Sequence, residues 1–219
     1  MTGQLLIQPL ISDSDKFVFH RLKQAIEAHL SVTITGSNIF QLGEEQTYGL
    51  TATLRYHGSE ESSSPSGTLP PVPNKLPPLT FKQDWSPISK LSSLTGLYRI
   101  YSVSPPDAEA IDFHGANFEL LDEPKAVNTE NGFICLHPSE SVTREVVLVP
   151  ACFDARPDTR YKIKMILGHG RIEWWGIGEI EEFRDVKVRS TELSNHGGLS
   201  IKSSNEIEVL AVEETHSAS

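Results

Sequence analysis

The amino-acid sequence predicts an all-β protein in which an antiparallel β-sandwich follows one N-terminal helix. Residues 48–56 alternate apolar and polar side chains, and this period of two places successive side chains on opposite faces of a strand. Extended segments of this kind recur at spacings of roughly 10–15 residues, which is typical of two antiparallel sheets packed face to face. No helical pattern separates these segments, which disfavours a parallel sheet with crossover helices.

Residues 13–29 carry the helical pattern of the chain. Ser14 or Asp15 could cap its first turn. The face predicted to be apolar consists of Val18, Leu22, Ala25, Ile26 and His29. An extended segment at 17–19 followed by a shorter helix is the alternative interpretation, and the continuous apolar face favours the longer helix.

The remaining apolar segments are predicted strands, separated by turn-forming residues. In chain order they are 30–34, 48–56, 79–81, 97–103, 118–121, 133–136, 142–149, 161–167, 171–182, 186–189, 199–201 and 207–212. The turn Asn131–Gly132 introduces the segment 133–136. Because the connection Gly168–Gly170 is short, 171–182 is expected to be the hairpin partner of 161–167.

The chain is expected to divide into an N-terminal extension with the helix (1–29), a β-sandwich domain (30–212) and a disordered tail (213–219). Within the sandwich, residues 58–78 contain six prolines and many serines. This composition forms neither a helix nor an inner strand, so the segment is predicted to be a long surface loop with polyproline character.

Composition excludes several classes of function. With a net charge of −10, the chain lacks the basic clusters that nucleic acid and anionic membrane surfaces require. It has no apolar stretch long enough to span a bilayer, and its first residues do not have the pattern of a signal peptide. Two cysteines, Cys135 and Cys152, are too few for a disulfide framework. We therefore expect a cytoplasmic protein with no nucleic-acid or membrane partner.

Several segments resemble those of small intracellular immunoglobulin-like sandwich proteins found mainly in filamentous fungi. The segments are Leu50–Tyr56, Leu79–Pro87, Gly96–Ile100 and Leu136–Val146. In that family a strand is followed by P-L/I-T-F/I-x-x-W-S/T-P and later by L-x-P-G-E-S. Here Ser139 replaces the glycine of the second motif. The resemblance covers roughly residues 30–185 and implies an immunoglobulin-like fold, but it supplies no catalytic residues.

Residues 171–182 are the best local candidate for a site. If they form one strand, Glu173, Trp175, Glu179 and Glu181 share a face. An aromatic ring flanked by carboxylates suits a sugar or a cationic ligand, and paired carboxylates perform acid–base catalysis in glycosidases. Glu173, Glu179 and Glu181 are therefore the catalytic candidates, and Trp175 is a ligand-binding candidate.

The competing interpretation is structural. The Glu-x-Asp-x-x-Glu motif of sandwich glycosidases is broken here, because Arg184 stands at the position of the last acid. Trp174 would then fill the core while the acids face solvent. Trp85 is a second ligand-binding candidate, with a core or loop-anchoring role as its alternative.

No cofactor or metal site is expected from the sequence. The eight histidines are scattered, and the chain has neither His-x-His nor Cys-x-x-Cys. The combination that could still assemble in space is His57, His114 and His137 with Asp112. A reactive thiol at Cys152 would need a base that the nearby Arg156 does not supply.

The function that this sequence favours is a non-enzymatic protein-binding or adaptor module. A protein partner would pair with a sheet edge or dock on the proline-rich loop, where Pro70–Pro73 and Pro77–Pro78 suit an aromatic groove. Unpaired sheet edges also leave a homodimer open. The alternative is a small-molecule or carbohydrate-active enzyme that uses the paired glutamates in a cleft of the sandwich.

Overall fold

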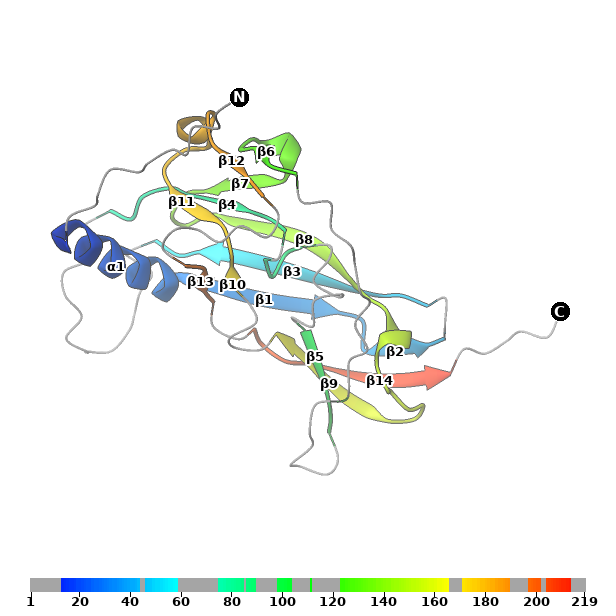
Figure 1. The fold of residues 1–219 in the computed structure, drawn as a ribbon. Coiled ribbons are helices and arrows are strands. Elements are labelled where there is room, and N and C mark those ends of the chain that lie inside the picture. Colours follow the sequence, from blue (N-terminus) through cyan, green and yellow to red (C-terminus); the bar gives the residue numbers. More distant parts are fainter. Residues whose placement is uncertain are drawn as a thin grey trace, which may run out of the picture.

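The computed structural model describes ten stretches of the chain (Figure 1). They are residues 13–43, 46–58, 75–84, 86–89, 98–103, 111, 123–165, 171–189, 197–201 and 204–213, with 13–18 and 171 described by their backbone. The predicted strand 118–121, Leu167 and most of the proline-rich loop lie outside these stretches. Among the described residues, no helix has the length and apolar character needed to cross a bilayer.

The predicted helix is confirmed as α1 (Asp13–Ala28), so the alternative of an extended segment at 17–19 is wrong. Its last turn packs on the sandwich, because Ala25 and Ile26 are buried in the main core. His29 follows the helix, is buried, and donates from Nδ1 to the Ala25 carbonyl at 2.8 Å. The apolar face therefore attaches the helix to the sheets.

The first sheet has the order β1-β3-β8 and is antiparallel throughout. Its strands are β1 (Leu30–Gly36), β3 (Tyr48–Tyr56) and β8 (Ser141–Leu148). The apolar side of β3 is buried along its whole length, and the polar side is exposed or half-buried. The alternation predicted for 48–56 is therefore confirmed residue by residue.

The second layer consists of short strands that form three hydrogen-bonded groups. They are β2 (Ile39–Leu42), β4 (Leu79–Lys82), β5 (Tyr98–Ser102), β7 (Phe133–Leu136), β9 (Arg160–Met165), β10 (Arg171–Ile172), β11 (Trp175–Ile177), β13 (Leu199–Ser200) and β14 (Ile207–Glu213). Four of them form the order β2-β14-β9-β5, in which only the β2–β14 pair is parallel. Further along the same segments, β13 pairs with β10, and β4 lies between β11 and β7. The segment with β13 and β14 therefore lies beside the segment with β9–β11, which lies beside the segment with β4 and β5.

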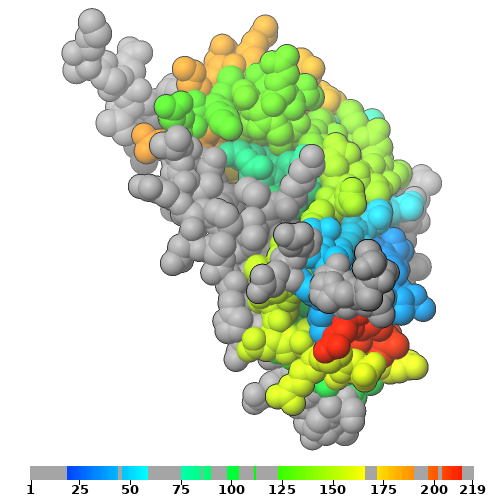
Figure 2. Space-filling view, turned by 90° about the vertical axis from the view of Figure 1, so that its right-hand side faces the viewer, coloured from blue at the N-terminus to red at the C-terminus, as the bar shows by residue number. Residues whose placement is uncertain are grey.

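These pairings define an immunoglobulin-like sandwich. Strands β1, β3 and β8 take the places of strands A, B and E, whereas the segments containing β4–β5, β9–β11 and β13–β14 take those of C, F and G. Figure 2 shows β14, in red, beside the blue segment that holds β1 and β2. The predicted all-β, immunoglobulin-like antiparallel sandwich with one N-terminal helix is confirmed.

One continuous core joins the two layers. Its fully buried members include Ile34 and Leu50 of the first sheet and Phe81, Ile163 and Ala211 of the second. Such burial is the main stabilising contribution to a domain of this kind, at about 25 cal/mol for each Å² of apolar surface. The core thus leaves the other face of β3, in the first sheet, toward solvent.

A second, smaller core lies on the outer face of the second layer, and Figure 1 shows its segments together at the top of the view. It contains Val127, Phe133, Trp174 and Val188, with Phe183 packed against it. The short elements around it are β6 (Lys125–Ala126), the 3-10 helices η2 (Thr129–Asn131) and η4 (Ile180–Phe183), and β12 (Lys187–Val188). The 3-10 helix η3 (Pro150–Cys152) lies elsewhere, beside β2.

The prediction that 171–182 is one strand and the hairpin partner of β9 is wrong. β9 pairs with β14 and β5, whereas β10 pairs with β13 and β11 pairs with β4. The strand ends because Gly178 has φ of 125°, a conformation that side chains rarely adopt, and η4 begins directly after Glu179. The alternating sequence pattern continues past the point where the extended backbone stops.

A cysteine, histidine and glutamate cluster as candidate functional site

Three strands of the second layer carry a polar row across their outer face. Thr80 of β4 lies opposite Cys135 of β7 on one side and opposite Gly176 of β11 on the other. Its neighbours Leu79 and Phe81 belong to the main core, so the row faces outward. The Thr80 hydroxyl donates to the Gly178 carbonyl at 2.8 Å and ties the end of β11 to this row.

A tight turn positions His137 directly after β7. The His137 amide donates to the Glu140 carboxylate at 2.9 Å, and the Glu140 amide donates to the His137 carbonyl at 3.0 Å. Within this turn Ser139 has φ of 74°, in the left-handed region that favours glycine. That conformation explains why the resembling motif has glycine where this chain has serine.

Glu179 is held at the start of η4. Its amide donates to the side chain of Glu182 at 2.8 Å, in the manner of an N-terminal capping interaction. The preceding Gly178 permits the chain to reverse, so that the Glu179 side chain returns over the row that contains Cys135.

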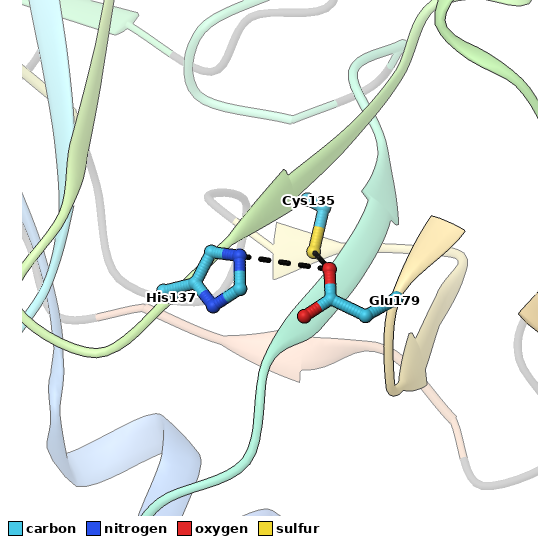
Figure 3. A group of neighbouring side chains, drawn as sticks. All are labelled: Cys135, His137 and Glu179. Carbon is cyan, nitrogen blue, oxygen red and sulfur yellow. Dashed lines mark hydrogen bonds and ion pairs between the residues drawn. The ribbon is translucent and has the colours of Figure 1, made fainter. Parts of the chain in front are cut away.

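Cys135, His137 and Glu179 meet at this point, although 44 residues separate the first from the last (Figure 3). The Glu179 Oε2 atom lies 3.4 Å from Cys135 Sγ and 3.5 Å from His137 Nε2. One ligand atom from each of the three residues lies within 4.8 Å of the others. The thiol is half-buried, whereas the side chains of His137 and Glu179 are 47% and 43% exposed, so solvent and small ions reach the cluster.

The surroundings of Cys135 keep its thiol protonated. Burial is the largest effect and raises the pKa, and the carboxylates of Glu179 and Glu140 raise it further. A hydrogen bond with Thr80 acts in the opposite direction and lowers it. The thiol therefore donates to Glu179 instead of acting as a preformed thiolate, and this does not favour a nucleophilic cysteine.

The raised pKa can be measured by alkylation. The experiment uses a Cys152→Ser background with a chelator present and follows the rate of Cys135 alkylation by iodoacetamide as a function of pH. Because only the thiolate reacts, the pH at which this rate reaches half its maximum should lie above 9.0, the ordinary pKa of a cysteine thiol. Glu179→Gln removes one carboxylate and should move this midpoint down. A midpoint below 9.0 in the parent protein would show that the thiol is activated.

Of the three glutamates predicted as catalytic, Glu179 is the one that joins the cluster with Cys135 and His137. Glu173 is half-buried between β10 and β11, and Glu181 is exposed in η4. The shared strand face on which their pairing depended does not exist, because the segment is broken. Their catalytic role stays a prediction without that geometric support.

The two described tryptophans are core residues. Trp175 belongs to the main core, is 3% exposed, lies with its ring 5.3 Å from that of Phe19, and donates from Nε1 to the Gly197 carbonyl at 2.8 Å. Trp174 is buried in the small outer core, so the alternative interpretation, which placed it in the sandwich core, is wrong about which core it fills. Trp85, the other ligand-binding candidate, lies outside the described residues.

The histidine combination considered from the sequence is described only in part. His57 shares a hydrogen bond of 2.6 Å with Ser31, and His114 and Asp112 lie outside the described residues. Sequence reasoning missed the pairing of Cys135 with His137. The local signal was a Cys-x-His at a strand end, since residues two apart on a strand point to the same side.

A free strand edge is the second notable feature. Among the described residues, β8 pairs with β3 alone. On the opposite edge of this sheet, formed by β1, the Asn205 carboxamide caps the outward peptide groups of Ile34: it accepts from the Ile34 amide at 2.7 Å and donates to the Ile34 carbonyl at 2.9 Å. Among the described residues, β8 thus offers a run of outward peptide groups with no strand partner, whereas β1 is capped at Ile34.

The peptide groups at this edge can be assigned from the ladder. Tyr56 donates its amide to Glu140, and hydrogen-bonded pairs alternate along an antiparallel ladder, so Thr143, Glu145 and Val147 direct their peptide groups away from β3. In agreement, the Thr143 carbonyl accepts from Arg144 Nη1 at 2.9 Å.

The fold and the site define an immunoglobulin-like β-sandwich with an outer-face cluster of titratable side chains. No protein-family model and no curated protein matches the chain. Among solved structures, the chain is similar to the CARDB domain of a Pyrococcus furiosus protein, solved in complex with di-metal ions, at 12% identity. The likeness covers 84% of this chain and 94% of that chain with a TM-score of 0.27, and at these values it carries no argument about function.

Proposed function

We propose that this chain is a non-enzymatic protein-binding module that receives an extended strand of a partner protein at the edge of β8. The observation that carries the proposal is the contrast between the two edges of one sheet: Asn205 caps the edge of β1 at Ile34, whereas β8 has no strand partner on its outer edge among the described residues. Addition of a strand to such an edge is a recurrent mode of peptide recognition, in which backbone hydrogen bonds supply affinity and side chains supply specificity.

The side chains of β8 define the chemistry of the partner strand. Val142, Arg144 and Val146 share the face toward the second layer, and Arg144 is exposed there whereas Val146 is buried. A cross-strand neighbour with an acidic residue opposite Arg144 and apolar residues opposite the two valines would complement this face. The expected partner segment therefore alternates apolar, acidic and apolar residues at every second position.

The same side chains disfavour self-association. In a two-fold pairing of β8 with its copy centred on Arg144, the two guanidinium groups would lie opposite each other, and centring on Glu145 would oppose two carboxylates. An inward-facing charge on an edge strand is a common protection against edge-to-edge aggregation. A heterologous partner strand is thus the occupant that we infer, in an intracellular setting like that of the fungal proteins which the sequence resembles.

A peptide-display library of random nine-residue segments tests the proposal on the full chain. Selected peptides should carry the alternating apolar–acidic–apolar pattern. Glu145→Pro removes one outward amide and leaves the ladder to β3 intact, so it should weaken binding about tenfold or more, at about 1.4 kcal/mol for each factor of ten. Glu145→Val keeps the amide and is the matched control, expected to bind within about twofold of the parent.

Arg144→Glu should reverse the preference of the library from acidic to basic residues at the central position. Peptides that bind Glu145→Pro as well as the parent would contradict edge pairing. A parent protein that selects no peptide, or that sediments as a dimer dissociated by Glu145→Pro, would replace the heterologous strand by a second copy of the chain.

A further inference from the structure

The side chains of Cys135, His137 and Glu179 take no part in the strand binding proposed for β8. All three side chains are ligand types of transition metals, and each comes from a separately fixed position: the strand β7, the turn after it and the start of η4. We propose that these three side chains form a Zn²⁺ site on the outer face of the second layer. The site is independent of the strand edge at β8.

The two separations from the Glu179 carboxylate to the other ligand atoms are close to those of tetrahedral zinc. With Zn–S of about 2.3 Å and Zn–O or Zn–N of about 2.0 Å, tetrahedral ligands lie about 3.5 Å apart for sulfur and oxygen and about 3.3 Å apart for nitrogen and oxygen. Here Cys135 Sγ lies 3.4 Å from Glu179 Oε2, and His137 Nε2 lies 3.5 Å from that oxygen. The remaining separation, between the thiol and the imidazole, lies within 4.8 Å, and rotation of the half-exposed His137 side chain would adjust it.

The donor set selects zinc over hard cations. A thiolate and an imidazole suit zinc and related transition metals, whereas Ca²⁺ and Mg²⁺ prefer sites made of oxygen alone. Three protein ligands leave a fourth tetrahedral position for water or for a group from another molecule. When zinc binds, the thiol gives up its proton to solvent and the sulfur forms the metal bond, which replaces the hydrogen bond from Cys135 to Glu179.

Neighbouring groups hold the ligands in place. Thr80 of β4 lies opposite Cys135 and donates to the Gly178 carbonyl, so it links two of the three ligand-bearing segments. Glu140 fixes the backbone of His137, and Glu182 fixes that of Glu179. Supporting contacts of this kind orient metal ligands, and the carboxylates of Glu140 and Glu182 add negative charge near the site.

The test uses the purified full chain after removal of metal by a chelator. Titration with Zn²⁺ should give one ion per chain, and Co²⁺ in its place should give the thiolate-to-metal charge-transfer band and the intense visible bands of a tetrahedral site. Cys135→Ser should abolish the charge-transfer band. Because loss of a supporting residue alone costs about 10–100-fold in metal affinity, loss of a ligand in Cys135→Ser, His137→Gln or Glu179→Gln should weaken Zn²⁺ binding by about 100-fold or more.

Two variants serve as matched controls. Cys152→Ser removes the other cysteine, and Glu181→Gln removes an exposed carboxylate two residues from Glu179; both should keep the parent affinity and spectrum. His137→Gln changes a side chain that is half exposed, so circular dichroism should show it folded. Absence of one-to-one binding, a cobalt spectrum without the thiolate band, or parent-like affinity in Cys135→Ser and His137→Gln would each overturn the proposal. Peptide selection at β8 is unaffected by these results.

Discussion

Replacement of Trp175 by alanine should lower the free energy of unfolding by about 3–5 kcal/mol, the usual cost of removing a large aromatic side chain from a core. The ring is 3% exposed and packs against Phe19 of α1. Its Nε1 donates to Gly197, just before β13. Loss of this one side chain therefore weakens the contact of β11 with the helix and also that with the β13 segment.

Urea unfolding followed by far-ultraviolet circular dichroism measures the effect, since this signal does not depend on tryptophan fluorescence. Trp175→Phe keeps an aromatic ring in the core but leaves the Gly197 carbonyl without its donor, so a smaller loss of about 1–3 kcal/mol is expected. An unchanged unfolding midpoint in Trp175→Ala would contradict the core assignment. In that case the ring would again be available as a ligand-binding platform.

The parts of the fold that the sequence predicts well are those in which one face of a long element is buried. In β3 every second residue from Tyr48 to Tyr56 is buried. In α1, Ala25 and Ile26 are three and four residues after Leu22, and all three reach or contact the core. When one face of an element is buried, apolar residues recur in the sequence with the period of that element. This period can be recognised without knowledge of the neighbouring element. Register and partner choice leave no such trace.

The segment around Trp174 shows why the rest could not be predicted. Its alternating pattern is compatible with one strand, but β10 and β11 have different partners and Gly178 ends the extended backbone. A glycine is required at position 176 for a different reason. A Cβ atom there would lie 2.5 Å from the ring of Phe183, a residue of η4 that packs over the strand. These constraints arise from tertiary contacts, and only the glycines themselves are visible in the sequence.

The candidate site also arises from tertiary contacts that the sequence does not reveal. Cys135 and Glu179 are 44 residues apart and meet because β7 and β11 both flank β4. A sequence without a compact ligand motif gives no sign of such a meeting. The predicted acids Glu173 and Glu181 shared a face only under the assumption of a continuous strand, so a wrong element boundary led directly to a wrong grouping of side chains.

The period of two on which the fold prediction depended can be tested at two adjacent positions of β3. Leu50→Ala should cost about 2–5 kcal/mol, because Leu50 is fully buried and its removal leaves a cavity between Val146 and the second layer. Thr51→Ala changes a side chain on the exposed face of the same strand and should cost less than about 1 kcal/mol, mostly through strand propensity.

Urea unfolding of both variants gives the difference directly, and equal slopes would show that the unfolded states are comparable. Each variant is the control of the other, since the two residues are adjacent in the same strand and their cross-strand partners are adjacent in the neighbouring strands. A residue on the buried face gains stability from the apolar area that it removes from water, whereas its neighbour removes almost none. Equal losses at Leu50 and Thr51 would therefore mean that β3 is not covered on one side, and the two-layer architecture would fail with it.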